Sequence, residues 1–163
     1  MKTDLVTGDV RVLVDRQFQL GENPLWDEVR RKLFWTDIHA GELWWSDADG
    51  GNAKRFYTGP KVGGFTLEAS GRLALFRETD IAIIDPESPK DVRKVAPFDE
   101  PNAERFNDVL ALADGTVFAG TIAARDGSGG VYHVSRDLMI RERFLGTDVS
   151  NGMALPSAGA LIW

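Results

Sequence analysis

The sequence predicts an all-β protein built from the blades of a β-propeller. Seventeen glycines and seven prolines are spread along the 163 residues, and short runs rich in Val, Ile, Phe, Trp and Leu lie between them. Short apolar runs bounded by turn residues are typical of β-strands. The runs recur in similar blocks of about 40–45 residues, which is the size of one four-stranded blade.

Each expected strand has four to six residues, and several alternate apolar with polar side chains. The stretch from Leu25 through Val29 to Leu33 also has helical spacing, but its polar centre favours a hairpin loop. The expected strands include Val10–Val14, Leu33–Ile38, Leu43–Ser46, Leu73–Phe76, Ile81–Asp85, Val117–Ile122 and Val131–Val134.

Four segments of the chain can be laid over one another, each with an apolar strand, a polar turn and a second apolar strand. They begin at Asn23, Phe65, Val109 and Gly152, and their equivalent positions are Leu33, Leu73, Val117 and Leu161. A third strand follows, and a fourth is expected in the first and third blocks, around Ala53–Tyr57 and Arg141–Leu145. A β-sandwich of similar hairpins is the alternative.

The repeat fills residues 1–163 with one domain of about three blades and the start of a fourth. The apolar run Ala160–Trp163 falls in the middle of a blade. A propeller must close its ring, because an open end leaves unpaired backbone groups and a bare apolar face. We therefore expect an incomplete β-propeller that is closed by a second copy or by a missing C-terminal half.

Composition excludes several classes of function. Nineteen Lys and Arg stand against 25 Asp and Glu, a net charge of -6, so nucleic acid and anionic membranes are not expected partners. The absence of cysteine excludes disulfides and thiol chemistry. The N-terminus has no signal-peptide pattern and no segment is long and apolar enough to span a membrane, which predicts a cytoplasmic protein.

Three oxygen-bearing side chains share one position of the repeat. Glu22 lies 11 residues before Leu33, and Asn107 and Asn151 each lie 10 residues before the equivalent position of their own blocks. Equivalent positions on inner strands point at the same part of a propeller's central channel. Their oxygens suit Ca²⁺ or Mg²⁺, with Zn²⁺ possible. The alternative is that each residue caps or forms a turn.

The second block has Gly63 and Gly64 at this register, which we expect to leave space. Arg105 should point the same way as Asn107 because strand side chains alternate. Its guanidinium could hold a substrate oxygen, or it could pair with a neighbouring carboxylate.

Several other polar and aromatic residues are expected to be structural. Asp37 and His39 follow a strand and are expected to face solvent, and His133 is expected to be a sheet residue. The tryptophans are expected to pack between blades, with one of them lining a sugar site as the alternative. These are Trp26, Trp35, Trp44 and Trp45.

Five short motifs in this order give the chain a resemblance to the senescence marker protein (regucalcin)/gluconolactonase/luciferin-regenerating enzyme family, over the N-terminal half of a member. The motifs are Leu20–Asp27, Leu33–Ile38, Arg105–Asp108, Phe118–Thr121 and Ser150–Met153. The resemblance implies a six-bladed β-propeller with one divalent metal, Ca²⁺ being preferred, that hydrolyses a small-molecule sugar lactone.

The resemblance also implies roles for individual residues. Glu22 and Asn151 would be metal ligands, Asn107 a metal or substrate ligand, and Arg105 a substrate contact. The family's remaining ligand, an aspartate proposed as the base, has no counterpart in this chain, so the chain alone is expected to be weak or inactive. The alternatives are a non-catalytic calcium-binding propeller module and a diisopropylfluorophosphatase-like phosphotriesterase.

Overall fold

Twelve β-strands form three separate four-stranded antiparallel sheets in a computed structural model that describes residues 10–156, 159 and 161–163. Each sheet is a meander in which consecutive strands are neighbours. The sheets are the blades predicted from the repeat. The residues that the structure describes contain no helix that could cross a membrane.

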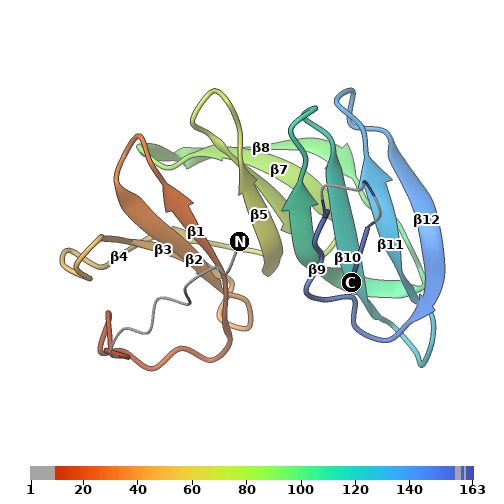
Figure 1. Ribbon diagram of the computed structural model, residues 1–163, viewed down its shortest axis with the longest axis horizontal. Coiled ribbons are helices and arrows are strands. Elements are labelled where there is room, and N and C mark those ends of the chain that lie inside the picture. The colour runs from red at the N-terminus through yellow and green to blue at the C-terminus, as the bar shows by residue number, and fades with distance from the viewer. Residues whose placement is uncertain (1–9, 157–158, 160) are drawn as a thin grey trace, which may run out of the picture.

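The first blade pairs β1 to β4 in order, the second β5 to β8, and the third β9 to β12. In Figure 1 the inner strands β1, β5 and β9 lie toward the middle of the molecule, and β4 and β12, the last strands of the first and third blades, lie toward its left and right sides. The strands are β1 (Gly21–Asp27), β2 (Lys32–Asp37), β3 (Glu42–Asp47), β4 (Lys54–Thr58), β5 (Val62–Leu67), β6 (Leu73–Arg77), β7 (Asp80–Asp85), β8 (Ser88–Pro97), β9 (Ala103–Ala111), β10 (Val117–Ala123), β11 (Gly129–Val134) and β12 (Ile140–Thr147).

Three expectations about strands are settled by these bounds. Residues 28–31 form the turn between β1 and β2, so the hairpin expectation is confirmed there. The expected strand Val10–Val14 is wrong, because those residues form no strand. The second blade has a fourth strand, β8, that the sequence did not indicate; its Pro89 and largely exposed side chains are typical of an edge strand.

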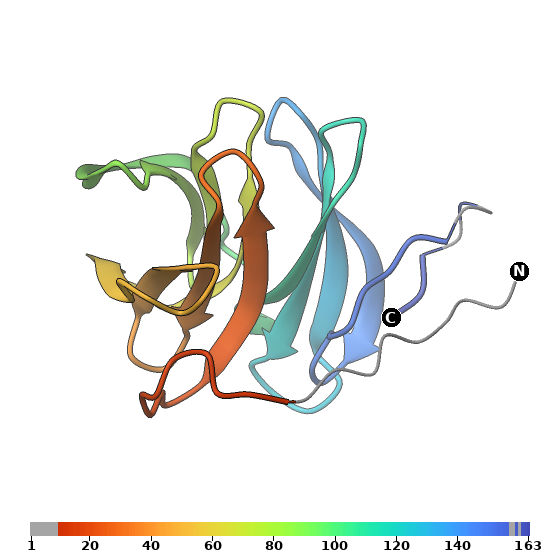
Figure 2. The same ribbon diagram turned by 60° about the vertical axis from the view of Figure 1, so that its left-hand side comes forward.

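The start of a fourth blade is visible as a short pairing after β12. Ala154 and Ile162 form an antiparallel bridge, and Val149 bridges back to Ile122 at the end of β10. Figure 2 shows this C-terminal segment beside the third blade.

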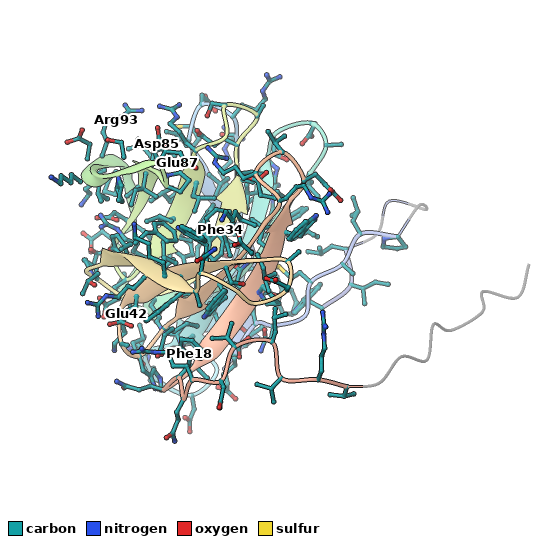
Figure 3. All side chains as sticks on the ribbon, turned by 90° about the vertical axis from the view of Figure 1, so that its left-hand side faces the viewer. Phe18, Phe34, Glu42, Asp85, Glu87 and Arg93 are labelled. Carbon is teal, nitrogen blue, oxygen red and sulfur yellow. The ribbon has the colours of Figure 1, made fainter. Side chains whose placement is uncertain are left out.

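The core lies between the blades in two apolar clusters. Phe34, Leu43 and Phe65 belong to the cluster between the first and second blades, and Phe76 and Phe106 to the cluster between the second and third. In Figure 3 Phe34 lies among the side chains of the first two blades. These two interfaces hold the inner strands in fixed positions.

The tryptophans divide between the two faces of the first blade. Trp45 packs against the cluster between the blades, as expected. Trp35 and Trp44 stack on the opposite face with ring centroids 6.4 Å apart, and Phe18 packs edge-on against both. For these two residues, the expectation of packing between blades is therefore wrong among the blades that the structure describes.

Candidate functional site

The three side chains that share a repeat register line one small cavity. Glu22 from β1, Asn107 from β9 and Asn151 from the segment after β12 surround a space of about 20 Å³. A space of that size holds about one water molecule or one ion. The structure brings the three residues together, and their role as metal ligands stays a prediction.

A bulge in β1 sets the position of Glu22. The pairing with β2 shifts register between Glu22 and Leu25, and Asn23 lies in the left-handed region at φ 52°. Asparagine tolerates that conformation better than most residues. Its Oδ1 accepts the Phe65 N–H at 2.8 Å, which ties the first blade to the second beside the cavity. Sequence reasoning gave Asn23 no role.

Asp37 holds the segment that leads into β1. It is buried, and its two carboxylate oxygens accept the N–H groups of Gln19 and Leu20, each at 2.9 Å. The expectation that Asp37 faces solvent is therefore wrong, whereas His39 is exposed as expected. The paired oxygens fix the backbone two residues before Glu22.

Gly63 allows two inner strands to approach closely. A Cβ atom at this position would lie 1.8 Å from the Phe106 carbonyl oxygen and 2.9 Å from the Asn107 nitrogen. Gly63 lines the cavity as expected, but the place that a side chain would take is filled by the backbone of β9. Only glycine permits such an approach, and it brings Asn107 to the cavity.

The Asn107 amide links its strand to the segment that carries Asn151. Its Nδ2 donates to the Ser150 carbonyl at 3.0 Å, and its Oδ1 accepts from Arg105 Nη1 at 3.0 Å. An amide oxygen has two lone pairs, so Oδ1 can accept a second partner. Asn107 therefore has a structural role beside its predicted ligand role.

Two further contacts hold the Asn151 segment against the third blade. Asp108 Oδ2 accepts the Met153 N–H at 3.1 Å, and the Ser150 N–H donates to the Thr121 carbonyl at 3.1 Å. A Cβ at Gly120 would lie 2.6 Å from the Ser150 Cβ. These contacts join residues far apart in sequence, and no local pattern marked them.

Arg105 is a buried cation held by neutral groups. Its exposed fraction is 5%, and Nη1 donates to the Phe106 carbonyl at 2.9 Å as well as to Asn107. Within the described part of the chain it forms no ion pair, so the pairing alternative is wrong. Burial lowers the pKa of Arg105, and the carboxylates of Glu104, Glu78 and Glu22 act in the opposite direction.

The donor set of the cavity fits a hard divalent cation. Among the described residues, the side chains of Glu22 and Asn151 take part in no hydrogen bond or ion pair, so their oxygens are available. No group of three or more His, Asp or Glu side chains that could hold a metal occurs in the described ranges. A site here would therefore depend on amide oxygens, which suit Ca²⁺ better than Zn²⁺.

Three antiparallel blades around a polar cavity define a propeller-type protein with a candidate ion site beside its inner strands. The family model described as the SMP-30/Gluconolactonase/LRE-like region matches residues 20–163. The chain belongs to this family, which confirms the resemblance drawn from the five motifs.

Two relatives carry names that state a reaction. The chain is 29% identical over 143 residues to pentonolactonase XacC of Haloferax volcanii, covering 86% of this chain and 47% of that protein. It is 28% identical over 148 residues to the 6-deoxy-6-sulfogluconolactonase of Pseudomonas putida, covering 89% of this chain and 50% of that protein. The chain spans about half the length of these relatives.

Solved structures agree on the fold. The calcium-binding protein regucalcin from Agrobacterium tumefaciens matches with a TM-score of 0.81 at 19% identity, over 91% of this chain and 51% of that structure. The luciferin-regenerating enzyme matches with a TM-score of 0.75 at 23% identity, over 86% of this chain and 50% of that structure. At these identities the likeness concerns the arrangement of strands.

Proposed function

We propose that the protein to which these blades belong hydrolyses a sugar lactone with one divalent cation, Ca²⁺ being preferred. Glu22 and Asn151 would be the metal ligands from this chain, and Asn107 a metal or substrate ligand. The observation that supports this most is the convergence of three oxygen-bearing side chains, from three separate repeats, on one cavity of about 20 Å³. The relatives named as lactonases supply the substrate class.

Each residue would contribute through its present position. A cation bound here would polarise the lactone carbonyl and stabilise the oxyanion. Arg105 would donate to a substrate oxygen. Among the described residues it does not line the cavity itself, but its buried guanidinium donates to Asn107, which does, and its hydrogen-bond partners are neutral. The bond to Asn107 would keep that guanidinium oriented without neutralising it.

The 163-residue chain by itself is expected to be weak or inactive. Hydrolysis requires a base to activate water, and general-base assistance contributes about 10²–10⁴-fold. Among the described lining residues the carboxylate besides Glu22 is Asp108, and its oxygens accept the N–H groups of Val109 and Met153. Neither histidine lines the cavity.

We further propose that additional blades close the ring, supplied by a C-terminal continuation or by a second copy. The third blade and the segment that follows it carry exposed apolar side chains, including Phe144 at 47% and Trp163 at 46%. A contiguous apolar surface of this kind marks an interaction site. The relatives have about twice the aligned length, which leaves room for as many blades again.

A non-catalytic calcium-binding module is the second candidate. Its support is the size of the cavity, which holds an ion but no sugar, together with the engagement of Asp108. The name of the Agrobacterium structural relative includes calcium binding. This candidate predicts the same metal response without turnover.

The test measures melting temperature and lactone hydrolysis with Ca²⁺ and with chelator. Ca²⁺ at 100 times its Kd should stabilise the chain by about 2.7 kcal/mol. Glu22→Gln should reduce this effect most, because it removes the charged ligand, and Asn151→Ala should reduce it as well. Glu28→Gln, in the exposed turn after β1, is the matched control and should respond like the wild type.

Activity is followed as proton release from gluconolactone, corrected for spontaneous hydrolysis. A six-bladed form should turn over only with metal, and the 163-residue chain should be slow or inactive. An unchanged metal response in both Glu22→Gln and Asn151→Ala would contradict the metal site. Rapid turnover that chelator does not reduce would contradict the proposed metal-dependent hydrolysis. Activity on a phosphotriester alone would favour the phosphotriesterase alternative.

A further inference from the structure

A second and larger cavity lies between the second and third blades. Its volume is about 380 Å³, and it opens among the turns that follow β5, β9 and β11. These turns stand together at the top of Figures 1 and 2. The candidate ion site lies at the starts of β1 and β5, so the two cavities occupy opposite ends of the inner strands.

The first blade shows what normally fills this place. Leu25, Phe34 and Trp45 are directly opposite one another on β1, β2 and β3, so they form one row across the sheet. All three pack against the cluster between the first and second blades. Cross-strand rows of large side chains are what fills the wedge between two packed sheets.

The second blade carries smaller residues in the equivalent row. Leu33 and Leu73 are equivalent repeat positions, so Ala74 corresponds to Phe34. Ala74 lies opposite Thr66 on β5 and Ile83 on β7. All three line the larger cavity.

The facing wall is smaller as well. Leu73 and Ile84 pair on the face that the second blade turns toward the first. The equivalent pair in the third blade is Val117 and Val134, and both line the cavity. The side chains on both walls are therefore smaller than their repeat counterparts between the first and second blades. This difference in side-chain size leaves the cavity.

We propose that this cavity binds a small apolar molecule, about the size of a bicyclic aromatic ring. Its deep wall includes the fully buried Phe76 and Ile81, and its size falls within the roughly 300–1,000 Å³ of small-molecule sites. The cavity is open at the turns, and its apolar deep wall is the kind of surface that binds the ring of an aromatic compound. Glu68 and Arg136 lie at the mouth, so a ligand with one polar group would place that group outward.

Indole is the probe for this site, because it is a bicyclic apolar molecule with a single N–H donor. NMR of the labelled chain should show indole-dependent shifts at Ala74, Ala111 and Ala113. Ala74→Phe copies the first blade's residue into the cavity and should weaken indole binding at least tenfold. Ala111→Leu, from the facing wall, gives a second test if Ala74→Phe fails to fold.

Phe144→Ser is the matched control, because it reduces the exposed apolar surface on the far face of the third blade and leaves the cavity intact. Indole binding should be unchanged in this variant. Shifts at Phe118 and His133 in place of the cavity residues would overturn the proposal. So would the absence of any shift at millimolar indole, or equal binding by the wild type and a folded Ala74→Phe. None of these readouts depends on the candidate ion site.

Discussion

The outward faces of the first and third blades differ in what covers them. On the first blade, Phe18 from the segment before β1 packs against Trp35 and Trp44 with ring centroids 5.7 and 5.6 Å away. The guanidinium of Arg16 lies 4.3 Å from the centre of the Trp44 ring. Both tryptophans are buried as a result.

On the third blade, the corresponding surface stays largely open. Phe144 from β12 contacts Trp163 edge-on at 5.1 Å, yet both rings remain nearly half exposed. Phe118, His133 and Leu161 line the hollow beside them. The comparison teaches that every blade has apolar side chains on both faces, and that burial of an end face depends on segments outside the blade.

The largest effect is expected where a blade face is fully covered. Phe34→Ala on the inner face of the first blade should cost about 3–5 kcal/mol of unfolding free energy, because it leaves a cavity in the core. Phe144→Ala removes the same ring from the open face and should cost less than about 1 kcal/mol. Urea unfolding measures both, and equal losses would break the comparison.

A smaller loss of stability is expected where Phe18 covers the outward face of the first blade. Phe18→Ala should cost about 1–2 kcal/mol, because two edge-on aromatic contacts and some apolar burial are lost. Tryptophan emission should shift to longer wavelength as Trp35 and Trp44 become solvated. Met139→Ala, at an exposed site of the third blade, is the control and should leave the emission unchanged. An unshifted spectrum for Phe18→Ala would show that Phe18 does not cover the pair.

The smallest expected loss of stability depends on pH. It is tested by comparing a buried turn aspartate of the first blade with an exposed one of the third. Burial alone would raise the pKa of Asp27, but the N–H groups of Arg30 and Val29 and the Arg30 guanidinium bring it below its ordinary value. A lowered folded pKa contributes stability above about pH 4, and that stability is lost as pH falls through the folded pKa. Asp27→Asn should therefore cost about 0.5–1.5 kcal/mol at neutral pH, with the difference shrinking toward pH 2.

Asp114→Asn is the counterpart in the third blade. Asp114 accepts from the N–H and hydroxyl of Thr116, which lower its pKa, but it lies exposed in its turn. Thermal melts between pH 2 and pH 7 should show the larger pH-dependent loss for Asp27→Asn. A loss of the same size for both variants would mean that burial of the turn does not matter.

The sequence was sufficient to predict the repeat and the convergence of its three polar residues on one place. The block lengths predicted blades, and the common register of Glu22, Asn107 and Asn151 predicted that they meet. It was insufficient for β8, because Pro89 and a polar composition conceal an edge strand that is held by its neighbour β7. It was also insufficient for Asp37, whose partners Gln19 and Leu20 lie on the other side of a hairpin.

By itself, the sequence determined the class of fold, the order of the strands and the residues that share a register. These depend on periodicity along the chain, which reports backbone direction and side-chain alternation. Only the tertiary structure decided that Gly63 admits the backbone of β9, that Arg105 is buried without an ion pair to any residue that the structure describes, and that a cavity lies between the second and third blades. Those features depend on the distance between sheets, and that distance is set by side chains from two blades packing together.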